Sequence, residues 1–177
     1  MTACPQCPQS SLRHTLVSDT LPGHTCASCG GILISLVAYR RWRETLGPVS
    51  EPSHNVHPAD DTDEIVTCSK CKGLMTKYRI SAEAPNRIDL CASCEDVWLD
   101  QGEWDLVEAL AGSDHLANII TQPWQRRIRM ETEEHLEETR LRDKFGDDYE
   151  RLSSFREWYF EHPARDEILA YLLRRLG

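Results

Sequence analysis

Cys91-Ala-Ser-Cys94-Glu-Asp-Val-Trp-Leu-Asp-Gln-Gly-Glu103 is the stretch that decides the fold of this chain. Its two cysteines, Cys91 and Cys94, are separated by two residues, and a matching pair, Cys68 and Cys71, lies 23 residues upstream. Two such turns joined by a short hairpin can place four thiolates around one ion in a tetrahedron, which is the geometry of a structural zinc site. The spacing therefore predicts that these four cysteines bind one zinc ion.

The same stretch also marks the start of a helix. Asp100 lies three residues before Glu103, which is the spacing of a capping box. In this arrangement the first side chain accepts hydrogen bonds from free N–H groups of the first helical turn, and the second reaches back to the cap. We therefore expect the metal-binding turn to lead directly into a helix over residues 101–111.

The cysteine spacing and the run Val97-Trp-Leu-Asp-Gln-Gly-Glu103 together resemble the transcription-factor-IIB-type zinc ribbon of small, mostly prokaryotic proteins. The resemblance covers residues 66–110. The family usually has two glycines after its second cysteine pair, where this chain has Glu95-Asp96. The resemblance implies a zinc-bound ribbon and, by analogy with the namesake, transcription machinery such as RNA polymerase as a partner.

All eight cysteines of the chain fall into four Cys-x-x-Cys pairs. The first two pairs lie 64 and 65 positions ahead of the last two, and the turn Cys-Ala-Ser-Cys occurs in both copies. Each copy holds four thiols, so we expect two structural Zn²⁺ ions. The predicted metal ligands are Cys4, Cys7, Cys26 and Cys29 in site 1, and Cys68, Cys71, Cys91 and Cys94 in site 2.

The first copy differs from the second after its last cysteine. It keeps two glycines, Gly30-Gly31, which allow backbone conformations that a β-carbon would oppose. Its run Leu33–Ala38 stands where the second copy has Trp-Leu-Asp-x-Gly-Glu, and Ser35 occupies the position of Asp100. We therefore read residues 2–45 as a diverged repeat that retains a helix cap.

Strand-type residues between the cysteine pairs, over 12–17, 74–80 and 88–90, predict short hairpins. The expected fold is a small, metal-stabilised α+β protein. Two zinc-ribbon (rubredoxin-like) β-hairpin modules are followed by an α-helical C-terminal region. The expected divisions are a first ribbon over 1–46, a Pro-rich linker over 47–63, a second ribbon with its helix over 64–112, and a helical region over 113–177.

The linker carries two histidines, His54 and His57, at a spacing that a further metal site could use. We favour two exposed side chains in an extended tether, because three prolines interrupt this segment and the eight thiols already account for two ions.

The C-terminal region reads as helices over 115–120, about 123–145, about 147–161 and 164–176, separated by Gly146 and by His162-Pro163. We expect the last two helices to pack as a hairpin. The side chains expected in its interface are Trp158, Tyr159, Ile168, Leu169, Leu172, Leu173 and Leu176.

The long helix is polar on nearly all sides. Its Arg126, Arg127 and Arg129 could contact phosphates, but pairing with the following glutamates is the reading we favour.

The net charge of −9 disfavours a simple non-specific nucleic-acid binder, which normally carries a basic face. The first residues lack the basic and apolar segments of a signal peptide, and no apolar run approaches the roughly 20 residues that cross a membrane. We therefore expect a cytoplasmic protein with metal-bound thiolates rather than a secreted disulfide scaffold.

The sequence offers no catalytic constellation. A four-cysteine zinc site has no open ligand position, and the chain has no nucleophile elbow, phosphate loop or HExxH motif. Iron in place of zinc, and a redox role for Cys4-Pro-Gln-Cys7, are the chemical alternatives. We expect a protein that is not an enzyme.

Two binding functions remain as predictions. The first is an adaptor or regulatory factor that docks on a larger protein assembly through its ribbons and its helical tail. Trp42 and Trp104 are candidate exposed aromatics for such a contact, although packing of each short helix on its own ribbon explains them at least as well. The tail could also pair two copies of the chain. The alternative is nucleic-acid binding by one ribbon, through Lys70, Lys72, Lys77 and Arg79, or through Arg40, Arg41 and Arg43.

Overall fold

The computed structural model describes residues 2–46, 64–111 and 115–174. The chain divides into two compact units, Met1–Thr132 and Glu133–Gly177. The expected linker over 47–63, with His54 and His57, lies outside the described residues, as does Leu176.

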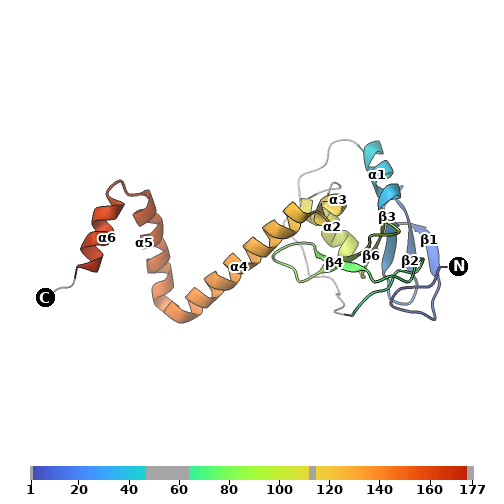
Figure 1. The fold of residues 1–177 in the computed structure, drawn as a ribbon, viewed down its shortest axis with the longest axis horizontal. Coiled ribbons are helices and arrows are strands. Elements are labelled where there is room, and N and C mark those ends of the chain that lie inside the picture. The colour runs from blue at the N-terminus through green and yellow to red at the C-terminus, as the bar shows by residue number, and fades with distance from the viewer. Residues whose placement is uncertain (1, 47–63, 112–114, 175–177) are drawn as a thin grey trace. The chain divides into compact units, whose positions relative to one another are not determined.

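A six-stranded antiparallel sheet forms the centre of the first unit (Figure 1). Its strand order is β1-β2-β3-β6-β5-β4, so each repeat supplies three consecutive strands. The α+β class predicted from the sequence is therefore confirmed. The strands are β1 (Leu12–Leu16), β2 (Pro22–Cys26), β3 (Ile32–Ser35), β4 (Thr76–Arg79), β5 (Arg87–Cys91) and β6 (Asp96–Leu99).

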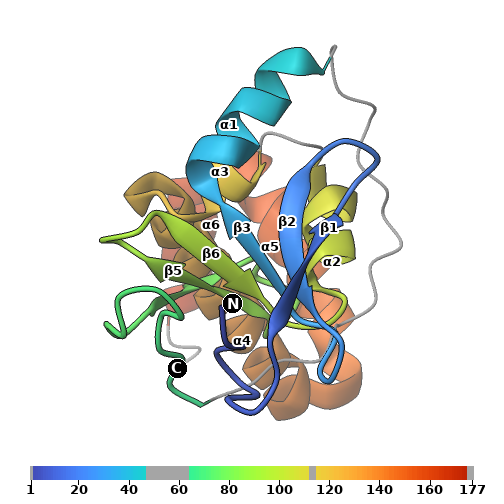
Figure 2. The ribbon, with the colours of Figure 1, turned by 90° about the vertical axis from the view of Figure 1, so that its right-hand side faces the viewer.

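The two repeats meet where β3 pairs with β6, and Figure 2 shows these two strands side by side. Leu33 lies opposite Trp98 in this pair. These residues are 65 positions apart, the same separation as Cys26 and Cys91. Equivalent positions of the two repeats therefore face each other, and an approximate two-fold axis passes between them. The ribbons, expected as two modules in series, share one sheet.

Helix α1 (Leu36–Thr45) follows β3, and helices α2 (Glu103–Ala111) and α3 (His115–Ile119) follow β6. Of the two alternatives for Trp42 and Trp104, exposure or packing, the structure shows packing: they are 8% and 4% exposed. Their rings lie 6.3 Å apart, one from each repeat. Each indole N–H also has a partner, because Trp42 donates to Thr20 and Trp104 to Ser18. The two tryptophans therefore stabilise the contact between the repeats.

The first turns of α4 (Gln122–Phe145) belong with the sheet, although the sequence placed a division at residue 113. Ile128 is 2% exposed. The Gln125 side chain accepts from the backbone N–H of Arg79 and donates to its carbonyl oxygen, so it occupies the outer edge of β4 as a neighbouring strand would. Trp124 donates its indole N–H to the Ile80 carbonyl. Among the described residues, no helix is both long and apolar enough to cross a membrane.

The second unit contains the rest of α4, a 3₁₀ turn (Gly146–Asp148), α5 (Tyr149–Glu161) and α6 (Arg165–Leu173). The predicted helix-ending role of Gly146 agrees with its φ of +51°, which favours glycine. The prediction that apolar side chains of α5 and α6 form a buried core between these helices is wrong. No residue between 133 and 174 is buried, and Trp158, Leu169, Leu172 and Leu173 are between 45% and 73% exposed.

Candidate metal centres

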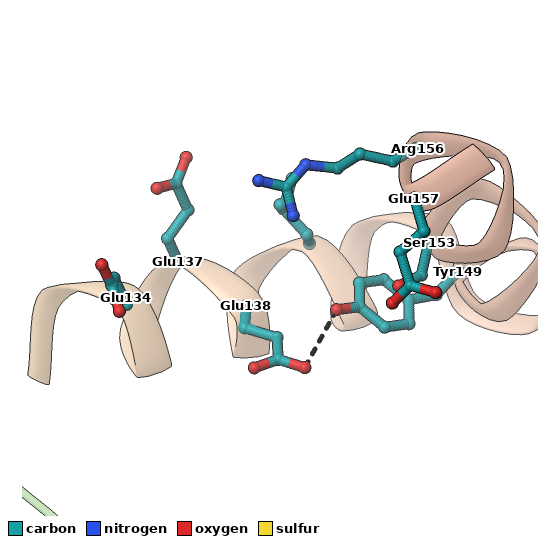
Figure 3. Close-up of a pocket in the computed structure, with 8 residues that line it drawn as sticks. Glu134, Glu137, Glu138, Tyr149, Ser153, Arg156 and Glu157 are labelled. Atoms are coloured by element: carbon teal, nitrogen blue, oxygen red, sulfur yellow. Dashed lines mark hydrogen bonds between the residues drawn. The ribbon is translucent and has the colours of Figure 1, made fainter. Parts of the chain in front are cut away.

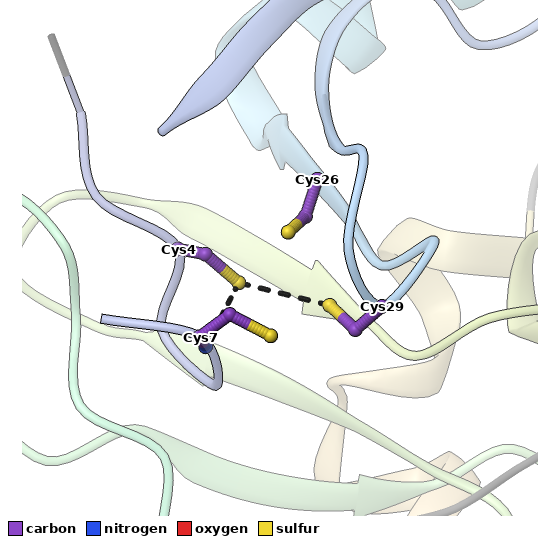
Figure 4. A group of neighbouring side chains, drawn as sticks. All are labelled: Cys4, Cys7, Cys26 and Cys29. Carbon is purple, nitrogen blue, oxygen red and sulfur yellow. Dashed lines mark hydrogen bonds between the residues drawn. The ribbon is translucent and has the colours of Figure 1, made fainter. Parts of the chain in front are cut away.

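The first candidate metal centre lies where the N-terminal turn meets the turn between β2 and β3 (Figure 4). The Sγ atoms of its four cysteines, Cys4, Cys7, Cys26 and Cys29, all lie within 4.8 Å of one another. The Cys7 backbone N–H donates to the Cys4 sulfur at 3.2 Å, and the Ser28 N–H donates to the Cys26 sulfur at 3.4 Å. Each turn therefore directs backbone donors at its first sulfur, which stabilises a thiolate there.

The second centre has the same construction. The Sγ atoms of Cys68, Cys71, Cys91 and Cys94 lie within 4.8 Å of one another, and the Lys70 backbone N–H donates to the Cys68 sulfur at 3.4 Å. All eight cysteines are free of disulfide bonds. The structure therefore brings together both ligand sets that the sequence predicts.

The sulfur spacing fits a tetrahedral metal ion. Zn–S bonds of about 2.3 Å at tetrahedral angles place the sulfurs about 3.8 Å apart. The Cys4 and Cys29 sulfurs are 3.7 Å apart, and those of Cys71 and Cys91 are 3.5 Å apart. Four thiol ligands exclude the hard oxygen-seeking cations Mg²⁺ and Ca²⁺ and suit zinc or iron. Both groups could therefore hold a metal ion.

Thiol acidity is uneven within site 1. Burial raises the pKa of Cys4 to about 11 and also raises that of Cys29. Burial opposes ionisation of Cys26 as well, but the backbone N–H groups of Cys29 and Ser28 outweigh it and lower the pKa of Cys26 to about 7. The Cys26 thiol is therefore easier to ionise than those of Cys4 and Cys29, and a bound cation would favour loss of the protons from these two.

Thiol acidity is also uneven within site 2. A hydrogen bond from the Gly73 backbone lowers the pKa of Cys71 to about 7. The neighbouring Cys71 thiol raises the pKa of Cys94 to about 12, and burial raises that of Cys91. The thiols with a lowered pKa, Cys26 and Cys71, are thus not equivalent in the two repeats, since Cys26 corresponds to Cys91.

The turn after the last cysteine keeps the same backbone in both repeats, despite the sequence departure. Gly30 has a φ of +70°, and Glu95, at the same position of the second repeat, has a φ of +53°. A non-glycine residue in this region costs about 1–2 kcal/mol. The next residue of the second repeat, Asp96, is 1% exposed and pairs with the Lys70 ammonium at 2.8 Å.

Gly31, which corresponds to Asp96 in the first repeat, makes room for Trp98. A Cβ at Gly31 would lie 2.2 Å from the Trp98 ring, which is fully buried. A tryptophan on one side of the two-fold axis therefore requires a glycine on the other.

The Glu103 half of the predicted capping box is confirmed, because the Glu103 carboxylate accepts the Asp100 backbone N–H at 2.9 Å. The Asp100 Oδ1 also accepts the Trp98 indole N–H at 2.9 Å and the Gln6 amide at 2.6 Å. Ser35 stands at the start of α1 without a side-chain capping bond.

These contacts interlock the two metal-binding turns. Gln6 belongs to the Cys4–Cys7 turn and reaches Asp100 of the second repeat. In the opposite direction, Ser69 of the Cys68–Cys71 turn donates to the Ala3 carbonyl at 2.6 Å. Sequence reasoning missed both residues, because each is an unremarkable polar residue inside a Cys-x-x-Cys turn and its partner lies in the other repeat.

Most of the candidate phosphate-binding cations have partners within the chain. Lys70 pairs with Asp96, Lys77 pairs with the buried Asp89, and Arg40 lies 3.7 Å from Glu95. Arg79 donates to Thr132 and to two backbone carbonyls. These side chains are therefore engaged in holding the sheet and its turns.

The site is thus defined by its own geometry, as two four-thiol centres in one two-fold sheet. No family model, curated protein or solved structure matches this chain.

Proposed function

We propose that this protein is a zinc-dependent adaptor that is not an enzyme. In this proposal two Zn²⁺ ions stabilise paired ribbons, similar to transcription-factor-IIB-type ribbons, and the resulting sheet binds a protein partner in the reducing cytoplasm. Transcription machinery is the partner class that the ribbon resemblance favours, by analogy.

The observation that carries the proposal is the closed character of both candidate centres. Each offers four sulfur ligands within 4.8 Å of one another, which complete a tetrahedron and leave no position for a substrate or a reactive water. A metal in such a site supports folding. The binding energy of structural zinc, on the order of 10–16 kcal/mol, compensates for the small cores of the repeats.

In this proposal the partner binds along the outer edge of β1. The Leu12 backbone N–H, in β1, bonds to Thr2, and the Val17 N–H, directly after the strand, bonds to Leu21 on the opposite side. Because backbone groups alternate along a strand, His14 and Leu16 direct theirs away from β2. On that side Thr2 and Ala3 pair with the Leu12 end of the strand, and in the described part of the chain no further strand lies beside His14 and Leu16.

The opposite edge of the sheet is covered. Arg79 in β4 corresponds to Leu16 in β1, and Gln125 bonds to both backbone groups of Arg79. Two edges related by the two-fold axis thus differ at this position, since Gln125 covers Arg79 whereas no described residue bonds to the outward backbone groups of Leu16. An open edge binds an extended peptide by adding it as a further strand.

Affinity capture from host lysate, with and without nuclease, tests the adaptor proposal. We expect a stoichiometric protein partner that survives nuclease treatment. Partners that disappear with nuclease would favour the nucleic-acid alternative, which the internal pairing of Lys70, Lys77 and Arg79 currently weakens.

A matched pair of variants tests the edge itself. Leu16→Pro removes the outward N–H and leaves the β1–β2 ladder intact, because the Leu16 N–H points away from β2 and donates no bond to that strand. Leu16→Ala removes the exposed side chain and keeps the N–H. We expect capture to be lost with proline and retained with alanine; equal capture by both variants would rule out strand addition at β1.

A further inference from the structure

The C-terminal unit presents large apolar side chains to solvent. On α5, Leu152, Phe155 and Trp158 are 44%, 41% and 49% exposed. On α6, three leucines are 45%, 55% and 73% exposed. We call these six residues the tail apolar face: Leu152, Phe155, Trp158, Leu169, Leu172 and Leu173.

Each helix gathers its share of this face on one side. At 100° per residue, the three side chains of α5 fall within about 120° and the three leucines of α6 within about 100°. The rings of Phe155 and Trp158 are 5.5 Å apart. The face therefore consists of one apolar stripe on each helix.

The remaining helix of this unit supplies no core for α5. A groove of about 710 Å³ lies between α4 and α5 and is lined mostly by polar side chains (Figure 3). Three of its carboxylates, on Glu134, Glu137 and Glu157, have no cationic partner in the described chain. The α4 side of α5 is thus hydrophilic, and the tail apolar face is left uncovered.

Helices of 13 and 9 residues are marginal in water without tertiary packing. We propose that the tail apolar face packs against the same face of a second copy of this chain. The protein is then a two-fold dimer in which two α5–α6 hairpins form a four-helix arrangement.

The exposed area matches what such a dimer needs. A large aromatic side chain offers about 150–250 Å² and leucine somewhat less, so the six side chains expose on the order of 500–600 Å² per copy. A standard interface buries about 800 Å² per partner, of which about 65% is apolar in homodimers, or roughly 500 Å².

The charge of the hairpin also suits self-association. The chain as a whole has a net charge of −9, but residues 149–174 carry four basic and five acidic side chains. Two copies of this nearly neutral segment can meet without strong electrostatic repulsion. Its mixed charges give no strong attraction to a basic protein or to an anionic membrane. The charged residues are Arg151, Arg156, Arg165 and Arg174, with Glu150, Glu157, Glu161, Asp166 and Glu167.

Sedimentation velocity of the full-length, zinc-loaded chain tests the proposal over an about hundred-fold range of concentration. We expect twice the monomer mass of 20.3 kDa for the natural sequence. The double variant Phe155→Glu/Leu172→Glu should sediment as a monomer, because it would bury carboxylates in the interface.

Phe160→Glu is the matched control. Phe160 is on the same helix and is 60% exposed, but it lies about 140° around the helix axis from Phe155. It should leave the dimer intact. A monomeric natural sequence at every concentration, or equal loss of association in the control, would overturn the proposal. Either result leaves the adaptor function to be judged separately by the lysate capture.

Discussion

At the scale of single residues, the two repeats adopt the same backbone conformation with different residues. The left-handed position after the last cysteine is glycine in the first repeat and Glu95 in the second. The Glu95 side chain forms an exposed ion pair with Arg40 at 3.7 Å, and this pair contributes at most about 1 kcal/mol to stability. The strain at Glu95 is therefore larger than the interaction that compensates for it.

Exchanging these residue types should have opposite effects. Glu95→Gly should raise the free energy of unfolding by about 0.5–1 kcal/mol, because glycine removes the strain at some cost in entropy. Gly30→Ala should lower it by about 1–3 kcal/mol, since its Cβ also meets the Gln101 side chain at 2.9 Å. Guanidinium titration of the zinc-loaded protein measures both. A destabilised Glu95→Gly would show that the αL conformation is not a source of strain there.

Glu103 is the second residue whose individual role can be tested. It is 0% exposed, and its carboxylate accepts the backbone N–H groups of Asp100 and Arg87. Glu103→Ala should lower the free energy of unfolding by about 2–4 kcal/mol, because buried donors lose their acceptor and a cavity remains. Glu103→Gln keeps one acceptor oxygen and should cost less in the same thermal melt. Equal losses in both variants would contradict the hydrogen-bonding role.

At the scale of secondary-structure elements, the β3–β6 pair turns two small repeats into one folded unit. Neither repeat has a large core of its own, and Trp98 is fully buried at the axis between them. The apolar group around it includes cysteines of both centres, namely Cys4, Cys26, Cys68 and Cys91. The metal centres and the strand junction therefore share one packed interior.

Trp98→Ala should consequently destabilise both repeats together. We expect a loss of about 3–5 kcal/mol and a single cooperative transition, monitored by amide hydrogen exchange in β2 and in β5. Leu16→Ala, at a side chain that is 59% exposed, is the control and should leave exchange in both strands nearly unchanged. Loss of protection in β5 alone would mean that the repeats unfold independently.

At the scale of the whole molecule, the interlocked turns predict that the two metals depend on each other. Gln6 reaches from the site 1 turn to Asp100, and Ser69 reaches from the site 2 turn to Ala3. If each cysteine group holds a metal ion, loss of one ion removes support from the turn that binds the other.

Cys94→Ser should lower the metal content by more than one equivalent, from the two expected in the natural sequence. Elemental analysis of the purified protein measures the metal, and near-ultraviolet circular dichroism reports the packing of Trp42 and Trp104 in the same sample. Ser93→Ala, in the same turn, is the control and should retain two equivalents. A Cys94→Ser protein with one full equivalent and native tryptophan packing would show that the two sites are independent.

Much of the local structure followed from residue types and spacing. Short-range geometry determines features that depend on neighbours within a few residues. These features are the Cys-x-x-Cys pairs, the strands within 12–17 and 74–80, and the helix after Asp100. Gly146 ended α4 for the same reason. The grouping of the cysteines into two sets also followed, because the 64- and 65-residue repeat left no cysteine over.

The sequence by itself thus determined the α+β class, the two four-cysteine ligand sets and most helix positions. Only the tertiary structure decided that β3 pairs with β6, that Trp42 meets Trp104, and that Gln125 covers the edge of β4. It also decided that the tail helices leave their apolar stripes exposed. The physical reason is the separation in sequence of the residues that interact. Turns and caps depend on residues close together in the chain, whereas strand pairing and burial depend on contacts between residues dozens of positions apart, which no local pattern specifies.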